Sequence, residues 1–233
     1  ETWRSVGLVV GGTSEEPVMQ HVTTACHHCA EPACMEGCPT KAYEKDAATG
    51  IVKHLEDQCF GCQYCILKCP YDVPKYSPKK GIVHKCDMCI GRLKEGESPA
   101  CVKACPTSAI RISIVDKDDL KKKYQEYVNV PTAPASNYTY PSTKYKTTRQ
   151  WPANMNSVDY LTVKPEHAHM PLVWMLVLTQ LSVGTFCINL LLNRVFQSSL
   201  NAVHVFVALG VGLLALAASI FHLGLPQYFY RAV

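Results

Sequence analysis

Apolar and charged positions divide the chain into three zones, of which the last is the most apolar. Two runs near the C-terminus, about residues 172–192 and 202–225, contain no Asp, Glu, Lys or Arg. A helix of either length reaches roughly 30 Å, the thickness of the hydrocarbon core of a bilayer. The runs therefore predict two antiparallel transmembrane helices, a helical hairpin joined by a short polar turn. The alternative, a buried helical pair in a soluble protein, is disfavoured by this length without charges.

The zone before these runs is polar and interrupted by proline. Residues 117–168 are rich in Lys, Tyr, Thr and Pro, and prolines such as Pro131, Pro141 and Pro152 break any long helix. This composition predicts an irregular, extended strap, and its aromatic residues favour packing on or beside a partner. A loose linker is the alternative interpretation.

Charge and composition narrow the class of protein. The formal net charge of +4 is too mild to indicate a nucleic-acid partner, and a hydrophobic content of 48% excludes a disordered chain. Within residues 170–233 the only charged side chains are Arg194 and Arg231, which excludes a single soluble globular domain. We expect three domains: a cysteine-rich domain at 1–116, the strap at 117–168 and a membrane anchor at 169–233.

Cysteines carry the clearest chemical signal in the chain. All of them except Cys187 lie in three blocks, spaced C-x2-C-x4-C-x3-C-P, C-x2-C-x2-C-x3-C-P and C-x2-C-x11-C-x3-C-P. The blocks are Cys26, Cys29, Cys34 and Cys38; Cys59, Cys62, Cys65 and Cys69; and Cys86, Cys89, Cys101 and Cys105. The second spacing is that of bacterial ferredoxins, whose thiolates bind the irons of [4Fe-4S] clusters. The repeat predicts an α+β fold with a duplicated bacterial-ferredoxin-like iron–sulfur domain.

Two local features refine this prediction. Proline after the fourth Cys of each block suits the first turn of a helix, so we expect that Cys at a helix start. Gly61 predicts a close approach of the backbone to the cluster sulfides. Zinc also uses C-x2-C pairs, but it does not explain the repeated three-residue step to Cys-Pro. Thiols spaced C-x2-C-x2-C are too crowded for separate disulfides. We interpret Cys187, inside the first apolar run, as a small packing residue.

In two-cluster ferredoxins, the fourth Cys of each block binds the cluster that is held by the first three Cys of the other block. Applied to this chain, the rule predicts that the first two blocks exchange their fourth Cys. One predicted cluster is held by Cys26, Cys29, Cys34 and Cys69, and the other by Cys59, Cys62, Cys65 and Cys38. The third block lacks a mate, so Cys105 either closes a third cluster with Cys86, Cys89 and Cys101 or serves a fourth cluster. We favour the second alternative, which requires another Cys block upstream of Glu1.

These spacings resemble those of the iron–sulfur subunit of dimethyl sulfoxide reductase-type molybdoenzymes. The local sequences Cys26-His27-His28-Cys29-Ala30-Glu31-Pro32-Ala33-Cys34 and Lys85-Cys86-Asp87-Met88-Cys89 are typical of that family. The resemblance covers about residues 1–116 and implies four Cys blocks and four clusters. His169-Met170-Pro171-Leu172 and His222-Leu223-Gly224 resemble the start of the family's membrane anchor, which has about eight helices. The resemblance implies a fusion truncated at both ends, with further membrane helices as partners.

Histidines in the apolar zone are candidates for a quinone site. In an antiparallel pair, His169 and His222 lie at the end that carries the iron–sulfur domain, whereas His204 lies at the other end. An imidazole can take a proton as a quinol loses electrons, and the resemblance implicates His222 in menaquinol binding. An interfacial His and a haem ligated by His169 and His222 are the alternatives. His27, His28, His54 and His84 are expected at the surface or beside ligands rather than as ligands.

No nucleophile–base pair, phosphate loop or nicotinamide fingerprint is visible. Apart from a quinol site, the chain therefore shows no substrate-converting centre, and we expect an electron-transfer and anchor subunit of an oxidoreductase. The resemblance implies a molybdopterin catalytic subunit as partner, quinone as electron carrier, anaerobic respiration and a prokaryotic inner membrane. It leaves open on which side of that membrane the iron–sulfur domain lies. The alternatives are a polyferredoxin-type subunit of a hydrogenase or ion-pumping complex, and a non-redox zinc-binding membrane adaptor.

Overall fold

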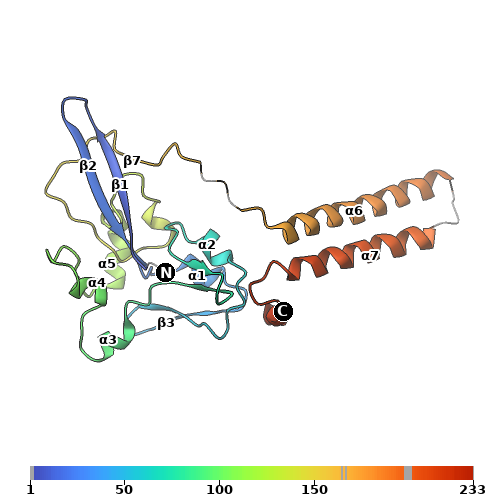
Figure 1. The fold of residues 1–233 in the computed structure, drawn as a ribbon, viewed down its shortest axis with the longest axis horizontal. Helices are drawn as coiled ribbons and strands as arrows, with labels where there is room; N and C mark the ends of the chain where they lie inside the picture. The colour runs from blue at the N-terminus through green and yellow to red at the C-terminus, as the bar shows by residue number, and fades with distance from the viewer. Residues whose placement is uncertain (1–2, 164, 166, 197–200, 233) are drawn as a thin grey trace. The chain divides into compact units, whose positions relative to one another are not determined.

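A computed structural model describes residues 3–163, 165, 167–196 and 201–232 (Figure 1). The chain forms two compact units, each built from several segments. The first unit consists of Glu1–Cys59, Gln63–Ser77 and Val83–Val163, and the second of Phe60–Cys62, Pro78–Ile82 and Lys164–Val233.

Short strands and short helices alternate before two long helices. The strands are β1 (Ser5–Gly12), β2 (Pro17–Thr24), β3 (Tyr43–Lys45), β4 (Val52–His54), β5 (Lys75–Ser77), β6 (Ile82–His84) and β7 (Asn156–Ser157). The α-helices are α1 (Ala33–Glu36), α2 (Tyr64–Lys68), α3 (Ile90–Lys94), α4 (Ala100–Lys103), α5 (Lys117–Lys122), α6 (Met170–Phe196) and α7 (Asn201–Ile220). Three 3-10 helices are η1 (Tyr124–Glu126), η2 (Ser136–Tyr138) and η3 (Pro226–Ala232).

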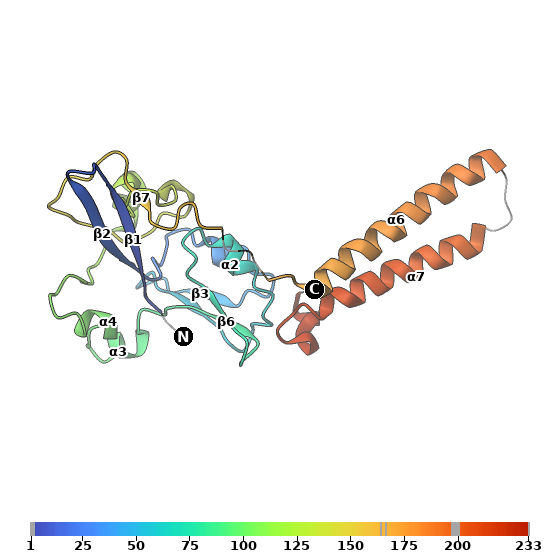
Figure 2. The same ribbon diagram turned by 45° about the horizontal axis from the view of Figure 1, so that its top comes forward.

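The first unit contains one three-stranded sheet and two small two-stranded sheets. Strand β1 lies between β2 and β7, and both neighbours are antiparallel to it, with Val9 opposite Gln20 and Ser157 (Figure 2). Strands β3 and β4 pair with Tyr43 opposite His54. Strand β5 pairs with β6. The regular part of the cysteine-rich zone is therefore small, and loops position most of its Cys residues.

The fourth Cys of each block follows a helix instead of starting one. Helices α1, α2 and α4 contain the third Cys of their blocks, and the Cys-Pro pair comes after the helix end. Cys69, the C-cap of α2, has extended backbone angles, φ −81° and ψ 113°. The expectation of a helix start was wrong because proline restricts the residue before it to extended conformations and offers no N–H donor for another turn.

Helices α1 and α2 pack against each other, so the first two Cys blocks are spatial neighbours. A Cβ added to Gly37, at the end of α1, would come within 2.7 Å of Lys68 Cγ at the end of α2. The core beside them is formed by Ala42, Val52 and Val83, each 1% exposed. Close packing of the two helices brings Cys34 and Cys65 to the same part of the unit.

The strap packs on the first Cys block of its own chain. The N–H groups of Ala30 and Glu31 donate to the carbonyls of Tyr140 and Thr139, at 2.8 and 3.0 Å. The Ser142 N–H donates to the His27 carbonyl at 3.1 Å. This part of the strap therefore packs against the first Cys block of the same chain, and its expected contact with a partner stays a prediction.

Helices α6 and α7 dominate the second unit, and small residues bring them together. Ala208 and Ala215 are fully buried, and Ser182 Oγ donates to the Ala208 carbonyl at 2.7 Å. A Cβ on Gly212 would lie 3.0 Å from Ser182 Oγ. Such close approach is typical of helices that associate in lipid, where small residues let backbones meet.

Both helices are long and apolar enough to cross a membrane, judged by length and composition. Only 11% of either span is buried within the chain, so most apolar side chains, and Cys187 among them, face outward. Helix α6 extends past the expected end at 192, whereas α7 stops before 225 because Gly224 and Pro226 interrupt it. Residues 197–200 of the expected polar turn lie outside the described residues.

Candidate iron–sulfur sites

The four thiols of the first predicted cluster influence one another's ionisation. Burial first, and then the neighbouring thiols of Cys26 and Cys69, raise the pKa of Cys29 to about 12. Burial, followed by the same two residues and Cys29, raises the pKa of Cys34. Burial and Cys26 also raise the pKa of Cys69. The structure therefore brings Cys69 of the second block to the first three cysteines of the first block.

This donor set fits a [4Fe-4S] cluster. Soft thiolates are the ligands of such clusters, and thiols with raised pKa values ionise when metal cations replace their protons. A cubane binds each thiolate at a different iron, so the four sulfurs do not have to converge on one point. Among the described residues, no three His, Cys, Asp or Glu side chains are grouped as ligands of a single ion.

A buried lysine lies beside the same thiols. Lys85 is 6% exposed, and its Nζ lies 3.7 Å from Cys26 Sγ. The ammonium also donates to the carbonyls of Val52 and Cys86. A cation at this position favours negative charge on the sulfurs, because burial strengthens the electrostatic attraction.

The second predicted set gathers around Tyr43 on β3. Burial first, then Cys65, and then Cys34 and Cys38, raise the pKa of the Tyr43 hydroxyl. Cys38 Sγ accepts a hydrogen bond from the Ala42 N–H at 3.2 Å. Tyr43 therefore lies near the fourth Cys of the first block and the third Cys of the second. Cys59 is buried in the first unit, and Cys62 belongs to the second unit.

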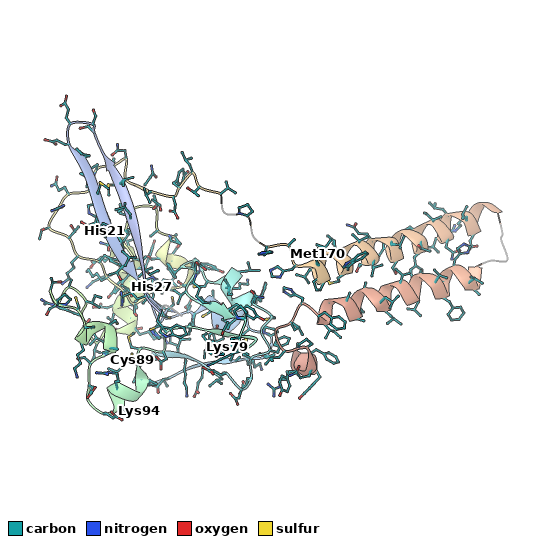
Figure 3. The ribbon with its side chains drawn as sticks, in the orientation of Figure 1. His21, His27, Lys79, Cys89, Lys94 and Met170 are labelled. Atoms are coloured by element: carbon teal, nitrogen blue, oxygen red, sulfur yellow. The ribbon has the colours of Figure 1, made fainter. Side chains whose placement is uncertain are left out.

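The third set is distributed over α3 and α4. Cys89 is the N-cap of α3 (Figure 3). Its φ of 51° is left-handed. The Met88 N–H donates to Cys86 Sγ at 3.4 Å, and Arg4 Nη2 donates to Cys101 Sγ at 3.7 Å. Hydrogen bonds from the backbone of Ile110 and other nearby groups lower the pKa of Cys105, which suits a thiolate ligand.

Each of the three Cys-Pro turns has the same local geometry. The residue three positions after the fourth Cys donates its N–H back to the Cys carbonyl at 3.2 or 3.3 Å and has a left-handed φ. These residues are Lys41 (φ 52°), Asp72 (φ 49°) and Ser108 (φ 51°). The residue two positions after the first Cys is also left-handed in every block: His28 (φ 40°), Gly61 (φ 76°) and Met88 (φ 61°).

Of the four histidines expected at the surface or beside ligands, three are buried. His27, His28 and His84 are at most 5% exposed, so these three are not surface residues. His28 Nδ1 accepts the Val52 N–H at 3.1 Å, and burial, followed by Lys85, lowers the pKa of His28 to about 3. His84 Nδ1 lies 3.1 Å from Glu56 Oε1. His54 and His84 both line a pocket of about 460 Å³.

Within the second unit, the segment after α7 binds the loop of the second Cys block. The Leu225 N–H donates to the Phe60 carbonyl at 3.0 Å, and the Gly224 N–H to the Gly61 carbonyl at 3.4 Å. A Cβ on Gly61 would lie 2.1 Å from the Gly81 carbonyl oxygen and 3.0 Å from Gly224 Cα. In the structure, Gly61 thus accommodates two other backbone segments, a role that differs from the expected approach to sulfide.

The candidate histidines His169 and His222 are in ring contact, with centroids 4.7 Å apart and planes at 87°. Axial histidines flank a haem from opposite faces, so direct edge-to-face contact does not fit a haem between them. His204 lies near the start of α7, at the opposite end of the helix from His222.

Two residues near the thiols have roles that the sequence did not indicate. In the sequence, only the position of Lys85 directly before Cys86 indicated that it could lie near a thiol. Thr139 is buried in the strap, and its carbonyl accepts a hydrogen bond at 3.0 Å from the N–H of Glu31, two residues beyond Cys29. Nothing in the local sequence connects Thr139 with a Cys so far away along the chain.

Comparisons with known proteins agree with this site. Residues 17–115 match the 4Fe-4S dicluster domain family. The chain is 41% identical over 122 residues to the B subunit of the anaerobic dimethyl sulfoxide reductase of Haemophilus influenzae, covering 52% of this chain and 58% of that protein. It is 44% identical over 96 residues to the formate dehydrogenase iron–sulfur subunit of the same organism, covering 41% of this chain and 30% of that protein. It is 36% identical over 147 residues to the hydrogenase-2 operon protein HybA of Escherichia coli O157:H7, covering 60% of this chain and 43% of that protein.

The chain spans 58% of the dimethyl sulfoxide reductase relative and less of the other two. The predicted iron–sulfur chemistry and the predicted resemblance are confirmed, whereas the number of clusters and the assignment of ligands stay predictions. Residues 17–115 thus match a 4Fe-4S dicluster domain, and the cysteine-rich part of the chain is homologous to the iron–sulfur B subunit of anaerobic dimethyl sulfoxide reductases.

Proposed function

We propose that this chain is a membrane-bound subunit that relays electrons between a quinone site and a molybdopterin catalytic subunit. The similarity to iron–sulfur subunits and the two apolar helices support this proposal. When bound, [4Fe-4S] clusters supply the one-electron redox centres of such a relay. The chain's own residues bind the clusters, control the charge around them and hold the quinone site. Conversion of the terminal substrate belongs to the partner.

We assign the first two clusters by exchange of the fourth Cys. The mutual effects among Cys26, Cys29, Cys34 and Cys69 support the first set. The shared proximity of Cys38 and Cys65 to Tyr43 supports the second, which also includes Cys59 and Cys62. Cys86, Cys89 and Cys101 bind a third cluster, and Cys105 serves a fourth cluster that an upstream block completes.

A duplicated ferredoxin-like architecture underlies these assignments. The two left-handed positions that recur in every block support it, because the same backbone turn recurs around each first Cys and after each Cys-Pro pair. The packing of α1 against α2 is the contact that lets two such blocks exchange a ligand.

The quinone site lies at the end of α7, and one observation carries this proposal. Gly224, two residues beyond His222, is hydrogen-bonded to Gly61, which stands between Cys59 and Cys62. A quinol at His222 is therefore close to the second Cys block. Oxidation of a quinol releases two electrons and two protons; the His222 imidazole accepts one proton as the electrons leave, and the other passes to water. His169, in contact with His222, orients its ring.

The outward-facing apolar side chains of α6 and α7 are proposed to contact lipid and further membrane helices. Residues such as Trp174, Leu190 and Phe206 are more than half exposed within this chain. Exposure of such large side chains to water is unfavourable, so a bilayer or partner helices must cover them. The prokaryotic inner membrane is the proposed location.

The test uses the complete membrane complex and the variant His222→Ala. We expect loss of quinol oxidation with the cluster signals in electron paramagnetic resonance retained, because the imidazole takes a proton but binds no iron. His204→Ala, at the other end of α7, is the matched control and should keep activity. Quinol oxidation that survives in His222→Ala, with intact clusters, contradicts this quinone site.

A hydrogenase-type partner is the second candidate. The similarity to HybA covers 60% of this chain, a larger share than the match to the dimethyl sulfoxide reductase B subunit. The co-purified catalytic subunit discriminates between the two. Molybdenum bound in that subunit supports the molybdopterin partner, and hydrogen uptake without molybdenum supports the hydrogenase.

A further inference from the structure

The end of strand β6 carries one charged side chain into the interior of the first unit. Val83 and His84 on β6 are buried, and Lys85, which follows directly, is only 6% exposed. Lysine is almost never buried to this extent without a partner, because the removal of an ammonium from water is costly. Within the described part of the chain, no carboxylate forms an ion pair with Lys85. Lys85 therefore needs another source of negative charge.

Three acceptors surround the Lys85 ammonium. Its Nζ donates to the carbonyl of Val52 on β4 and to the Cys86 carbonyl, the latter at 3.0 Å. The third acceptor is the sulfur of Cys26, which lies 3.7 Å from Nζ. An ammonium has three N–H donors, so these acceptors engage all of them. Because the two carbonyls are neutral, the Cys26 thiolate is the acceptor that can balance the charge.

The backbone of Val52 holds the ammonium in place beside the first Cys block. The Val52 side chain is 1% exposed, and its N–H donates to His28 Nδ1 at 3.1 Å. The carbonyl of the same residue accepts from Lys85. A shift of Lys85 away from this position would leave buried polar groups unpaired, which is costly. The distance between the ammonium and the Cys26 sulfur is therefore fixed by the packing of β4 and the first block.

A buried cation beside a cluster ligand affects a redox centre through its charge. A cluster bound by four thiolates is an anion, and reduction by one electron makes it more negative. A cation that donates to one of these thiolates stabilises the reduced state more than the oxidised state. Hydrogen bonds to the sulfurs, net charge and solvent exposure set the potentials of such clusters. Burial of Lys85 strengthens the effect, because little water screens the charge.

We propose that Lys85 is a positioning residue that acts through the Cys26 thiolate and raises the reduction potential of the cluster bound there. The ammonium keeps its proton in both redox states. The single added electron comes from the chemical reductant in a titration and from quinol in the proposed relay. This inference rests on Cys26 as a cluster ligand, which is part of the proposed function. It does not depend on the exchange of Cys69, on the quinone site or on the identity of the catalytic partner.

The experiment is a redox titration of the intact complex followed by electron paramagnetic resonance. Cys26→Ser first identifies the cluster, because the signal of that cluster disappears in this variant. Lys85→Met removes the charge and keeps an unbranched side chain of similar length. We expect Lys85→Met to lower the reduced-to-oxidised ratio of that cluster about tenfold at a fixed potential, which is about 59 mV for a one-electron couple. A larger shift in any other cluster overturns the proposal.

Two control variants separate the buried charge from packing and from surface charge. Lys85→Arg keeps the charge, so its ratio should stay near that of the natural protein. Lys53→Met removes a charge next to Val52 at an exposed position on β4, where water screens it, and should leave the ratio unchanged. A shift in either control equal to that in Lys85→Met overturns the proposal.

Iron and sulfide content are measured in parallel. An unshifted potential in Lys85→Met with full iron content overturns the role of Lys85 but leaves the proposed electron relay intact. If Lys85→Met loses iron, Lys85→Gln is titrated, which keeps N–H donors without the charge; a downward shift supports the proposal and no shift contradicts it. If both neutral variants lose iron, iron retained in Lys85→Arg supports the role of the charge, and iron lost there as well overturns it. Natural protein that contains zinc in place of iron contradicts the proposed function itself.

Discussion

His169 and His222 meet edge to face, with ring centroids 4.7 Å apart, although one precedes α6 and the other follows α7. The ring contact places the start of α6 and the segment after α7 at the same end of the helix pair. The hydrogen bonds of Gly224 and Leu225 hold that end on the loop of the second Cys block within the second unit. Backbone hydrogen bonds thus join the segment after His222 to the loop around Gly61, an arrangement that supports the quinol site proposed above.

If the first two blocks exchange their fourth Cys, substitutions in different blocks should remove the same cluster. We expect Cys69→Ser and Cys29→Ser to eliminate one shared set of spectroscopic signals and to reduce iron by about four atoms per chain. Cys62→Ser should eliminate a different set. Cys187→Ser, on the exposed face of α6, is the control and should retain all iron. Signals lost in Cys69→Ser that match those lost in Cys62→Ser would falsify the exchange.

Substitution of Cys105 distinguishes the two alternatives for the third block. We expect Cys105→Ser and Cys101→Ser to eliminate different sets of electron paramagnetic resonance signals, because the proposed assignment places the two thiols on different clusters. Iron is measured per chain in parallel, after anaerobic purification. Loss of the same signals in both variants would show that Cys105 closes the third cluster.

Alanine substitutions at Gly61 and Gly50 test how much the packing between the Gly61 loop and the segment after α7 contributes to stability. Both have a left-handed φ, +76° and +70°, but a Cβ at Gly61 would meet the Gly81 carbonyl at 2.1 Å, whereas Gly50 faces open space. Gly50→Ala should therefore cost about 1 kcal/mol from backbone conformation alone. Gly61→Ala should cost several times more, on the order of 3 kcal/mol, because backbone segments must move apart.

Thermal unfolding of both glycine variants, together with quinol oxidation, measures this difference. We expect Gly61→Ala to lose quinol oxidation as well, since the clash displaces the Gly224 segment next to His222. Equal stability of the two variants would show that the packing around Gly61 contributes little.

The half-buried His54 predicts a loss of stability in mild acid. Burial first, then the charges of His84 and Lys85, lowers the pKa of His54 to about 4 from its ordinary 6.5. Between these values the unfolded chain binds a proton that the folded chain does not, so stability falls as the pH drops through this window. The loss is at most about 3 kcal/mol, since His54 is partly exposed and screened.

Unfolding followed by circular dichroism between pH 7 and pH 4 tests the His54 prediction. His54→Phe keeps a ring against Tyr43, whose centroid lies 4.9 Å from that of His54, and removes the titrating group. The pH dependence of this variant should be flatter than that of the natural protein. If the stability of His54→Phe and of the natural protein falls equally with decreasing pH, groups other than His54 cause the acid sensitivity.

Sequence alone determined the chemistry of the site and the existence of the long helices. Both depend on local patterns: thiols at ferredoxin spacing specify iron–sulfur ligation, and uninterrupted apolar runs specify helices that need a nonaqueous environment. The exchange of Cys69 into the first block stays a prediction, which follows from the same spacing rule. The Cys-Pro turns were misplaced relative to the helices, since proline is compatible with either end of a short helix.

Only the tertiary structure decided what surrounds the thiols. Thr139 bonds Glu31 because the strap folds back on the first block, and Gly61 meets Gly224 because the segment after α7 returns to the loop of the second block. Such contacts join residues that are far apart along the sequence, and no spacing rule relates them. They arise from the packing of whole segments, where burial and hydrogen bonding between distant groups outweigh local preference.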